Sequence, residues 1–266
     1  MEYHNIKFEE PEAGMGLITL NRPDRLNALS LDMVKELHLL FDQLHDKEQV
    51  RVLVITGQGR GFCSGADLKD AKRRREAATV FSSATVHLVS IQKKYADLIL
   101  KMRRLPQPII AAVNGPAAGG GMCLALASDV LIASPQAAFT PSFINIGLSG
   151  GEMGTTYFLP RKIGSARAAE ILLTGRTVDA EEAERIGLVS RVVAGERLGE
   201  VAMELARRML AKSPMGLRLT KEAMDQNLTA PSLEAAIELE NRNQSMCCCT
   251  PEFLRAVAAF MEKKPG

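Results

Sequence analysis

Three adjacent glycines follow a short apolar run near the middle of the chain. The run is Ile109–Val113, and the glycines are Gly119, Gly120 and Gly121, which lead into a segment rich in Ala and Leu. This pattern is typical of a buried strand, a tight turn and a short buried helix. Glycine has no β-carbon, so a ligand can approach the backbone closely here. The unpaired N–H groups of a first helical turn carry partial positive charge and favour an oxyanion or a phosphate.

The first two-thirds of the chain alternate strand and helix patterns that can position this turn. A second loop of small residues, Phe62–Lys69, follows another apolar run. Ser30 is placed to cap an amphipathic helix whose apolar positions recur every three or four residues. We predict strands at Met15–Leu20, Val50–Thr56, Ile109–Val113, Asp129–Ser134, Ala138–Thr140 and Leu188–Val193, and further helices at about 82–104, 153–163, 165–173 and 180–186.

From Glu196 onward the pattern predicts helices alone. Thr250-Pro251-Glu252 is a start signal, a capping residue followed by proline at the first helical position. We therefore expect an α/β core over residues 1–195 and a C-terminal helical region over 196–266.

Composition argues for an ordinary globular protein. At 266 residues with 46% apolar and 24% charged residues, the chain can bury a sizeable core. A net charge of +2 gives no reason to expect nucleic acid or a membrane surface as a partner. No apolar run approaches the ~18 residues of a membrane span, and the first residues lack the apolar region of a signal peptide. We expect a cytoplasmic protein.

The five cysteines and four histidines show no spacing typical of a metal site. Cys63 and Cys123 lie beside glycines, and Cys247–Cys249 are consecutive. We interpret them as free, mostly buried thiols. A reactive Cys123 is the alternative, because a helix N-terminus can lower the pKa of a thiol.

Several of these segments together resemble the crotonase superfamily, the enoyl-CoA hydratase/isomerase family. The resemblance is carried by Asn21–Leu29, Gly61–Leu68, Asn114–Gly121 with Ser128-Asp129, Leu173–Ala183 and Gly187–Val192, in matching order and spacing. It implies a spiral core of repeated β-β-α units, with trimers or hexamers held together by the C-terminal helices. It also implies a coenzyme A thioester as substrate, with no separate cofactor and no metal.

The resemblance assigns roles to particular residues. The backbone N–H groups of Ala66 and Gly120 would bind the thioester carbonyl. Both lie on loops that follow strands, where two amides can converge on one oxygen. Removing one such donor costs about 3–4 kcal/mol of transition-state stabilisation. Other residues would contact the substrate: Leu26, Ala28, Asp67 and Leu68 the adenine and pantetheine path, Lys69 a CoA phosphate, and Phe260 and Lys263 of a neighbouring subunit the adenine.

Lys69 and Phe260 also have plain structural interpretations. Lys69 and the basic stretch Lys72–Arg75 can be a solvated surface segment, and Phe260 can be a packed core aromatic.

Acyl-chain preference would depend on the region from Phe81 to Ile99 and on Phe143, Ile144 and Met153.

The chain departs from the family pattern at both hydratase glutamates. Cys123 stands two residues after the third glycine, and Phe143 stands four residues before Gly147. Neither a thiol nor a phenyl ring can position water and transfer its proton as paired carboxylates do. Efficient hydration of the usual two-glutamate kind is therefore not expected.

A nearby carboxylate, Glu152, is the remaining candidate for acid–base chemistry. Some isomerases of the family have an acidic residue in this loop, although the spacing from Gly147 to Gly164 is one residue longer here than in ordinary hydratases. As a hypothesis, Glu152 abstracts an α- or γ-proton while Ala66 and Gly120 hold the enolate. The alternative is a surface glutamate in a first helical turn, where the helix dipole stabilises it by about 0.3–1 kcal/mol.

Other classes match less of the sequence. Gly147-Leu-Ser149-Gly-Gly151 fits the nucleophile elbow of a serine hydrolase, but all four histidines precede Ser149. A dinucleotide-binding motif would need a third glycine at Leu124, and a P-loop would need Gly-Lys-Ser/Thr. A non-catalytic acyl-CoA-binding protein stays open, and within the enzymes hydration, isomerisation, thioester hydrolysis and decarboxylation all pass through a similar oxyanion.

Overall fold

The computed structural model describes residues 3–69 and 84–262, with side chains omitted for 84–88. Its largest layer is a six-stranded sheet in the order β1-β2-β3-β4-β6-β9. The strands are β1 (Ile6–Glu12), β2 (Met15–Leu20), β3 (Val52–Gly57), β4 (Ile109–Val113), β6 (Val130–Ala133) and β9 (Arg191–Val192). From β2 to β9 every pair is parallel, and only the β1–β2 hairpin is antiparallel.

A second, three-stranded sheet continues from the first. It contains β5 (Pro116–Ala118), β7 (Ala138–Thr140) and β8 (Val178–Asp179), in the order β5-β7-β8. Because β5 follows β4 and β7 follows β6, the chain passes from the large sheet to the small one after two successive parallel strands. The small sheet is therefore built from short strands that come directly after β4 and β6 of the large sheet.

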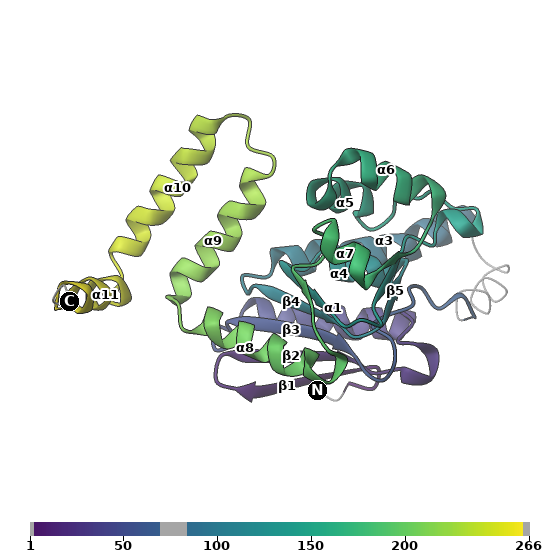
Figure 1. Ribbon diagram of the computed structural model, residues 1–266, viewed down its shortest axis with the longest axis horizontal. Coiled ribbons are helices and arrows are strands. Elements are labelled where there is room, and N and C mark those ends of the chain that lie inside the picture. Colours follow the sequence, from purple (N-terminus) through teal and green to yellow (C-terminus); the bar gives the residue numbers. More distant parts are fainter. Residues whose placement is uncertain (1–2, 70–83, 263–266) are drawn as a thin grey trace.

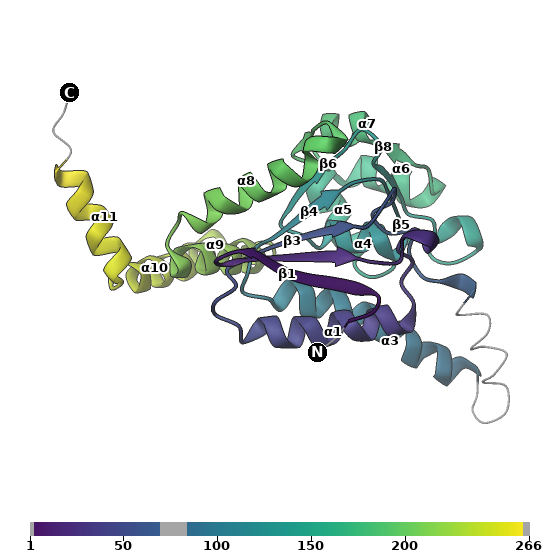
Figure 2. The same ribbon diagram turned by 90° about the horizontal axis from the view of Figure 1, so that it is seen from below.

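Helices cover both faces of the large sheet. On one face lie α1 (Leu31–His45) and α3 (Ala84–Arg104), and on the other lies α8 (Leu198–Leu210), as Figure 2 shows. As predicted, Ser30 caps α1, because its hydroxyl oxygen accepts a hydrogen bond from the Met33 N–H at 3.2 Å. The central strands are buried on both faces, which explains their continuous apolar sequences.

The remaining helices follow in two groups. The first group consists of α4 (Gly120–Leu126), α5 (Thr155–Ile163), α6 (Ser165–Thr174) and α7 (Ala180–Arg185). Three short 3-10 turns occur elsewhere along the chain: η1 (Pro23–Arg25), η2 (Ile144–Ile146) and η3 (Gly195–Arg197). The last three helices, α9 (Pro214–Asn227), α10 (Leu233–Cys248) and α11 (Pro251–Glu262), extend away from the sheets (Figure 1).

The packing of α8 shows where the extended part begins. Leu198, Ala202 and Ala206 of α8 pack on Val54 and Ile110 of the large sheet. The chain leaves the sheet only after this helix, so the segment that extends is α9–α11. No helix of the described part combines the length and the apolar character needed to cross a bilayer.

Candidate active site

The three-glycine turn joins β5 of the small sheet to α4. Gly119 adopts a positive φ of 49°, and its N–H donates to the Thr140 carbonyl of β7 at 2.9 Å. Helix α4 begins at the next residue, so the Gly120 N–H belongs to the first helical turn and has no partner inside the helix. The turn thus has the strand–glycine–helix arrangement that the sequence predicts.

The second loop lies directly against this turn. The Cys63 N–H donates to the Pro116 carbonyl at 3.1 Å, and the Ala118 N–H donates back to the Cys63 carbonyl at 2.9 Å. At Gly65, which has a φ of 89°, a β-carbon would lie 3.2 Å from the Gly120 nitrogen. The backbones of the two segments are therefore hydrogen-bonded to each other, and Gly65, the neighbour of Ala66, packs closely beside Gly120.

A short parallel bridge fixes the direction of the Ala66 amide. The Leu29 N–H donates to the Gly65 carbonyl at 2.8 Å, and the Asp67 N–H donates to the Leu29 carbonyl at 3.0 Å. Because Gly65 and Asp67 make the two bonds to Leu29, Ala66 between them directs its own N–H away from Leu29. Among the described residues, neither the Ala66 nor the Gly120 N–H donates a hydrogen bond, so both amides remain able to bind a ligand oxygen.

Two polar side chains connect the turn after β2 to the second loop. Arg22 forms an ion pair with Asp67 at 2.9 Å and also donates to the Ala28 carbonyl. Asn27, which is fully buried, accepts from the Arg22 N–H at 2.8 Å and donates to the carbonyl of Gly61 at 2.8 Å. These bonds satisfy buried polar groups and hold the two segments in register.

The predicted CoA-contacting residues are brought together by this connection. Leu26 accepts a hydrogen bond from the Ser64 N–H at 2.9 Å, Ala28 is buried, and Leu68 is exposed. Lys69 and Asp67 share the lining of a polar cavity of about 280 Å³. Its other lining residues are Asn5, Arg22, Arg25, Ser30 and Asp32.

Glu152 lies beside the glycine turn. Its carbonyl oxygen is 3.6 Å from the Cys123 Sγ of α4, and the sulfur of the next residue, Met153, would be 3.3 Å from a β-carbon on Gly120. Helix α5 starts only at Thr155, so Glu152 is outside the first helical turn. The helix expected at about 153–163 is confirmed with a start two residues later, but the interpretation of Glu152 as a residue of its first turn is wrong. Instead, the carboxylate accepts a hydrogen bond from Gln92 of α3.

Comparison with known proteins identifies the family. The family model described as enoyl-CoA hydratase/isomerase matches residues 10–266. This chain belongs to the enoyl-CoA hydratase/isomerase family. Membership makes it an acyl-CoA-processing enzyme of the crotonase fold, whose exact reaction the family name leaves open.

Individual relatives agree over nearly the whole length. A Mycobacterium leprae protein named "Probable enoyl-CoA hydratase echA12" is 45% identical over 261 residues, covering 98% of this chain and 87% of that protein. A solved structure of a "probable enoyl-CoA hydratase/isomerase from Mycobacterium abscessus" matches with a TM-score of 0.88 and 42% identity, covering 99% of this chain and 98% of that one. A structure titled as a monofunctional enoyl CoA isomerase from M. smegmatis matches with a TM-score of 0.73 and 43% identity, covering 88% and 98%.

The two residues expected to stand in place of the hydratase glutamates are both buried. The Phe143 ring lies against the glycine turn, with Cε1 3.4 Å from where a β-carbon on Gly119 would be. Cys123 is fully buried, and its thiol contacts the Gly119 carbonyl at 3.2 Å. An apolar ring and a buried thiol therefore occupy these two positions.

The cysteine predictions are confirmed in part. Burial is the main cause that raises the pKa of Cys123 well above its ordinary value, with the Glu152 charge adding to it. Burial likewise raises the pKa of Cys63 to about 12. The alternative interpretation of Cys123 as a reactive thiol is therefore wrong, because a thiol with a raised pKa stays protonated. All five cysteines are free, as predicted. Only Cys63 and Cys123 are buried, while Cys247 is partly buried and Cys248 and Cys249 are exposed, so the expectation of mostly buried thiols holds for two of the five.

The nucleophile-elbow alternative lacks its structural setting. Ser149 follows η2 rather than a strand, and its Oγ accepts a hydrogen bond from the Gly151 N–H at 3.2 Å. An elbow requires a sharp strand-to-helix turn. In the described part of the chain, no hydrogen bond of the Ser149 hydroxyl would activate it as a nucleophile.

The predicted C-terminal contacts lie apart from the glycine turn. Phe260 of α11 is 80% exposed, so its interpretation as a packed core aromatic is wrong for the isolated chain. Lys263, Lys72–Arg75 and Phe81 lie outside the described residues. A neighbouring subunit as the source of Phe260 and Lys263 stays a prediction.

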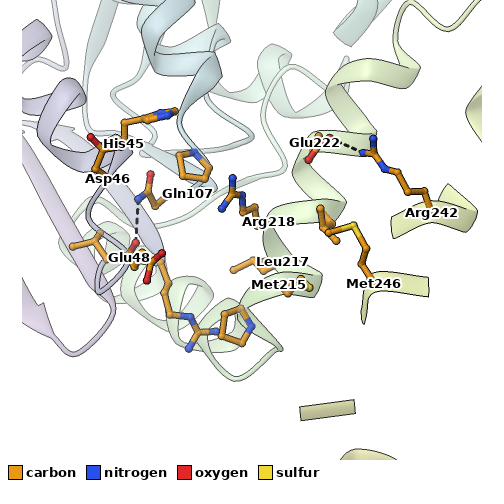
Figure 3. Close-up of a pocket in the computed structure, with 15 residues that line it drawn as sticks. His45, Asp46, Glu48, Gln107, Met215, Leu217, Arg218, Glu222, Arg242 and Met246 are labelled. Atoms are coloured by element: carbon orange, nitrogen blue, oxygen red, sulfur yellow. Dashed lines mark hydrogen bonds and ion pairs between the residues drawn. The ribbon is translucent and has the colours of Figure 1, made fainter. Parts of the chain in front are cut away.

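A separate cleft of about 1020 Å³ lies at the other end of the strands, where β3 and β4 begin. Figure 3 shows its lining residues. The cleft is lined there by residues such as Arg51 and Gln107, and by α9 and α10, whose Glu222 and Arg242 form an ion pair. None of the residues predicted for chemistry lines this cleft. The candidate active site is therefore the pair of glycine-containing loops, which follow strands, and not this larger space.

Sequence reasoning missed the residues that hold the site together. Asn27 has a positive φ of 55°, a conformation in which asparagine is enriched. An asparagine in this turn is therefore the sequence signal that could have indicated its role. Gln92 and Thr155 give no such signal. Thr155 acts through bonds to Glu152 only three residues away, in a loop without a regular pattern. The contact of Gln92 with Glu152 joins elements 60 residues apart in sequence.

Proposed function

We propose that this chain isomerises the double bond of an enoyl-CoA thioester, with Glu152 as the base and the Ala66 and Gly120 N–H groups as the oxyanion site. The observation that carries the proposal is the placement of Glu152. Its backbone touches Cys123, and its neighbour Met153 packs on Gly120. The Glu152 charge also contributes to the raised pKa of Cys123, which supports a carboxylate near the turn that supplies one of the two amides.

The reaction follows from this arrangement. The Glu152 carboxylate takes a proton from C2 of a 3-enoyl thioester, and the C–H electron pair moves toward the thioester carbonyl. The resulting dienolate oxygen is stabilised by the two N–H groups, which together supply a large part of the catalysis. Return of the proton to C4 gives the conjugated 2-enoyl thioester. Atoms and electrons balance without a co-reactant.

The apolar surroundings favour isomerisation over hydration. Phe143 and Met153 are both 7% exposed and cover the glycine turn with a ring and a thioether. Neither can orient a water molecule, and the protonated Cys123 thiol cannot act as a base. In this proposal Phe143 forms part of the acyl-group wall.

The coenzyme A portion is assigned to the neighbouring segments. Leu26, Ala28, Asp67 and Leu68 would border the pantetheine and adenine path. Lys69, at the 280 Å³ cavity that also contains Arg22 and Arg25, would bind a phosphate. Phe260 and Lys263 from a second copy would cover the adenine, within a trimer or a hexamer.

Replacement of Glu152 tests the proposal. With 3-enoyl-CoA substrates of several chain lengths, Glu152→Gln should lower kcat by about 10²–10⁴-fold while KM changes little, because the amide keeps the shape but accepts no proton. Isomerisation is followed by the ultraviolet absorbance of the conjugated product. Glu196→Gln, an exposed carboxylate in η3, serves as the control and should keep full activity.

Three results would contradict the proposal. Unchanged turnover in Glu152→Gln removes Glu152 from the mechanism. Faster hydration of 2-enoyl-CoA than isomerisation of 3-enoyl-CoA by the native protein would indicate a hydratase. Acyl-CoA binding without turnover of any enoyl or 3-oxoacyl thioester would indicate a binding protein that lost its chemistry.

A further inference from the structure

The backbone of Glu152 is held on several sides. Its carbonyl accepts hydrogen bonds from the Thr155 N–H at 2.9 Å and the Thr155 hydroxyl at 3.0 Å, and its N–H donates to the same hydroxyl oxygen at 3.1 Å. Thr155 is fully buried. The starting point of the Glu152 side chain is therefore fixed relative to α4 and α5.

The far end of the side chain is held by a different element. Gln92 projects from α3, and its Nε2 donates to the Glu152 Oε1. Within the described residues this is the one hydrogen bond that the carboxylate makes, and Oε2 has none. Since a glutamate side chain has three rotatable bonds, backbone contacts alone leave its carboxylate free to turn toward solvent.

We propose that Gln92 is a positioning residue that holds the Glu152 carboxylate toward the reacting carbon through its amide donor. This inference rests on the proposed role of Glu152 as the base. The Gln92 amide donates to Oε1 and leaves Oε2 to accept the proton from C2. An amide nitrogen is not a base at neutral pH, so Gln92 takes no part in proton transfer itself.

The amide donor suits both stages of the cycle. Before the reaction, Oε1 of the carboxylate accepts the Gln92 N–H. After Oε2 takes the proton, Oε1 is a neutral carbonyl oxygen that still accepts from the same N–H. The hydrogen bond therefore holds the group in one orientation while the proton is taken and returned.

Gln92→Met tests the inference, because methionine has nearly the same length and donates no hydrogen bond. We expect kcat for the 3-enoyl-CoA to fall by about 10–100-fold, the loss typical of a misplaced catalytic group, with KM within about twofold. Gln226→Met is the matched control, since Gln226 donates to Glu222 in a similar pair on α9 and should keep native kinetics.

A double-mutant cycle distinguishes positioning from a structural role. In the Glu152→Gln background, Gln92→Met should cause no further loss, because the group it positions no longer accepts a proton. An equal loss in both backgrounds would mean that Gln92 supports the fold instead, and would overturn the inference. Native kcat in Gln92→Met, with Glu152→Gln inactive, would overturn it while leaving the proposed function intact. Native kcat in Glu152→Gln would overturn both.

Discussion

The strained residues of the described chain lie at the candidate active site. Leu26, Asn27 and Met153 are its non-glycine residues with positive φ, at 48°, 55° and 46°. For an ordinary side chain this conformation costs about 1–2 kcal/mol. Leu26 and Asn27 lead into the segment that pairs with Ala66, and Met153 packs on Gly120. The surrounding hydrogen bonds therefore maintain an unfavourable backbone where the two loops meet.

Gly65 tests whether the contact between the loops matters. In Gly65→Ala, the new β-carbon would lie 2.8 Å from the Ala118 carbonyl oxygen and 3.2 Å from the Gly120 nitrogen, and φ would stay at 89°. Because the obstructing atoms belong to the backbone, the two amides must shift apart, and we expect kcat/KM to fall by about 10²-fold. Steady-state kinetics with the 3-enoyl-CoA checks this.

Gly187→Ala is the control that distinguishes the steric clash expected in Gly65→Ala from the backbone strain of an alanine at positive φ. Gly187 has a φ of 78°, but no atom lies within 4 Å of its β-carbon position. Its replacement should cost about 1–2 kcal/mol of stability and leave kcat/KM near the native value. Native activity in Gly65→Ala would show that the reaction does not depend on this spacing.

At the scale of elements, the sequence predicted the parts whose pattern is local. The runs Met15–Leu20 and Ile109–Val113 are strands with the expected bounds, because both faces of these parallel strands are apolar. The strand β1 was missed, since Ile6–Glu12 is mostly polar and contains a proline, as an edge strand tolerates. The strands β5 and β8 are too short to give a pattern.

The arrangement of elements was less accessible than their positions. The sequence placed both glycine-containing loops, but the resemblance to a known family was needed to pair Ala66 with Gly120. The contact of α3 with Glu152 depends on one exposed glutamine, Gln92, which no periodicity singles out. Such contacts are set by tertiary packing, which local sequence does not encode.

The helix α9 is attached to the core by a buried cluster of charges. Lys221, 6% exposed, donates to the Gln107 carbonyl at 2.8 Å and pairs with Asp129 at 3.1 Å. Asp129 also accepts from the Ile109 N–H at 2.7 Å and pairs with Arg103, which contacts Asp225 of α9. The Lys221 ammonium is therefore well paired but largely removed from water.

This cluster predicts a pH dependence of stability. Burial is the main cause that lowers the pKa of Lys221 to about 8, against about 10.4 in the unfolded chain. Between these values the unfolded state binds more protons than the folded state, so the free energy of unfolding should rise with pH. From pH 7.5 to 9.5 the native protein should gain about 1–2 kcal/mol relative to Lys221→Met, measured by urea unfolding. Equal slopes for the two proteins would refute this.

At the scale of the whole molecule, the C-terminal helices bury little of their apolar surface. Helix α11 has no buried residue, and α10 has only Asn243. Phe253, Val257 and Phe260 recur at helical spacing along α11 and are 38–80% exposed. An exposed apolar stripe of this kind marks a surface that a partner covers. The 1020 Å³ cleft between the core and these helices also remains open in the single chain (Figure 3).

A second copy of the chain is the partner that the family resemblance implies, and a charge on the stripe tests this. We expect the native protein to be a trimer or a hexamer, and Val257→Glu to dissociate it, because burying an unpaired carboxylate costs several kcal/mol. Light scattering after gel filtration measures the mass. Arg255→Glu, at a 72% exposed side chain paired with Glu252, changes the charge of the same helix and should leave the mass unchanged. A native protein that is monomeric, or an unchanged mass for Val257→Glu, would exclude assembly through α11, and with it the contribution of Phe260 to a neighbouring site.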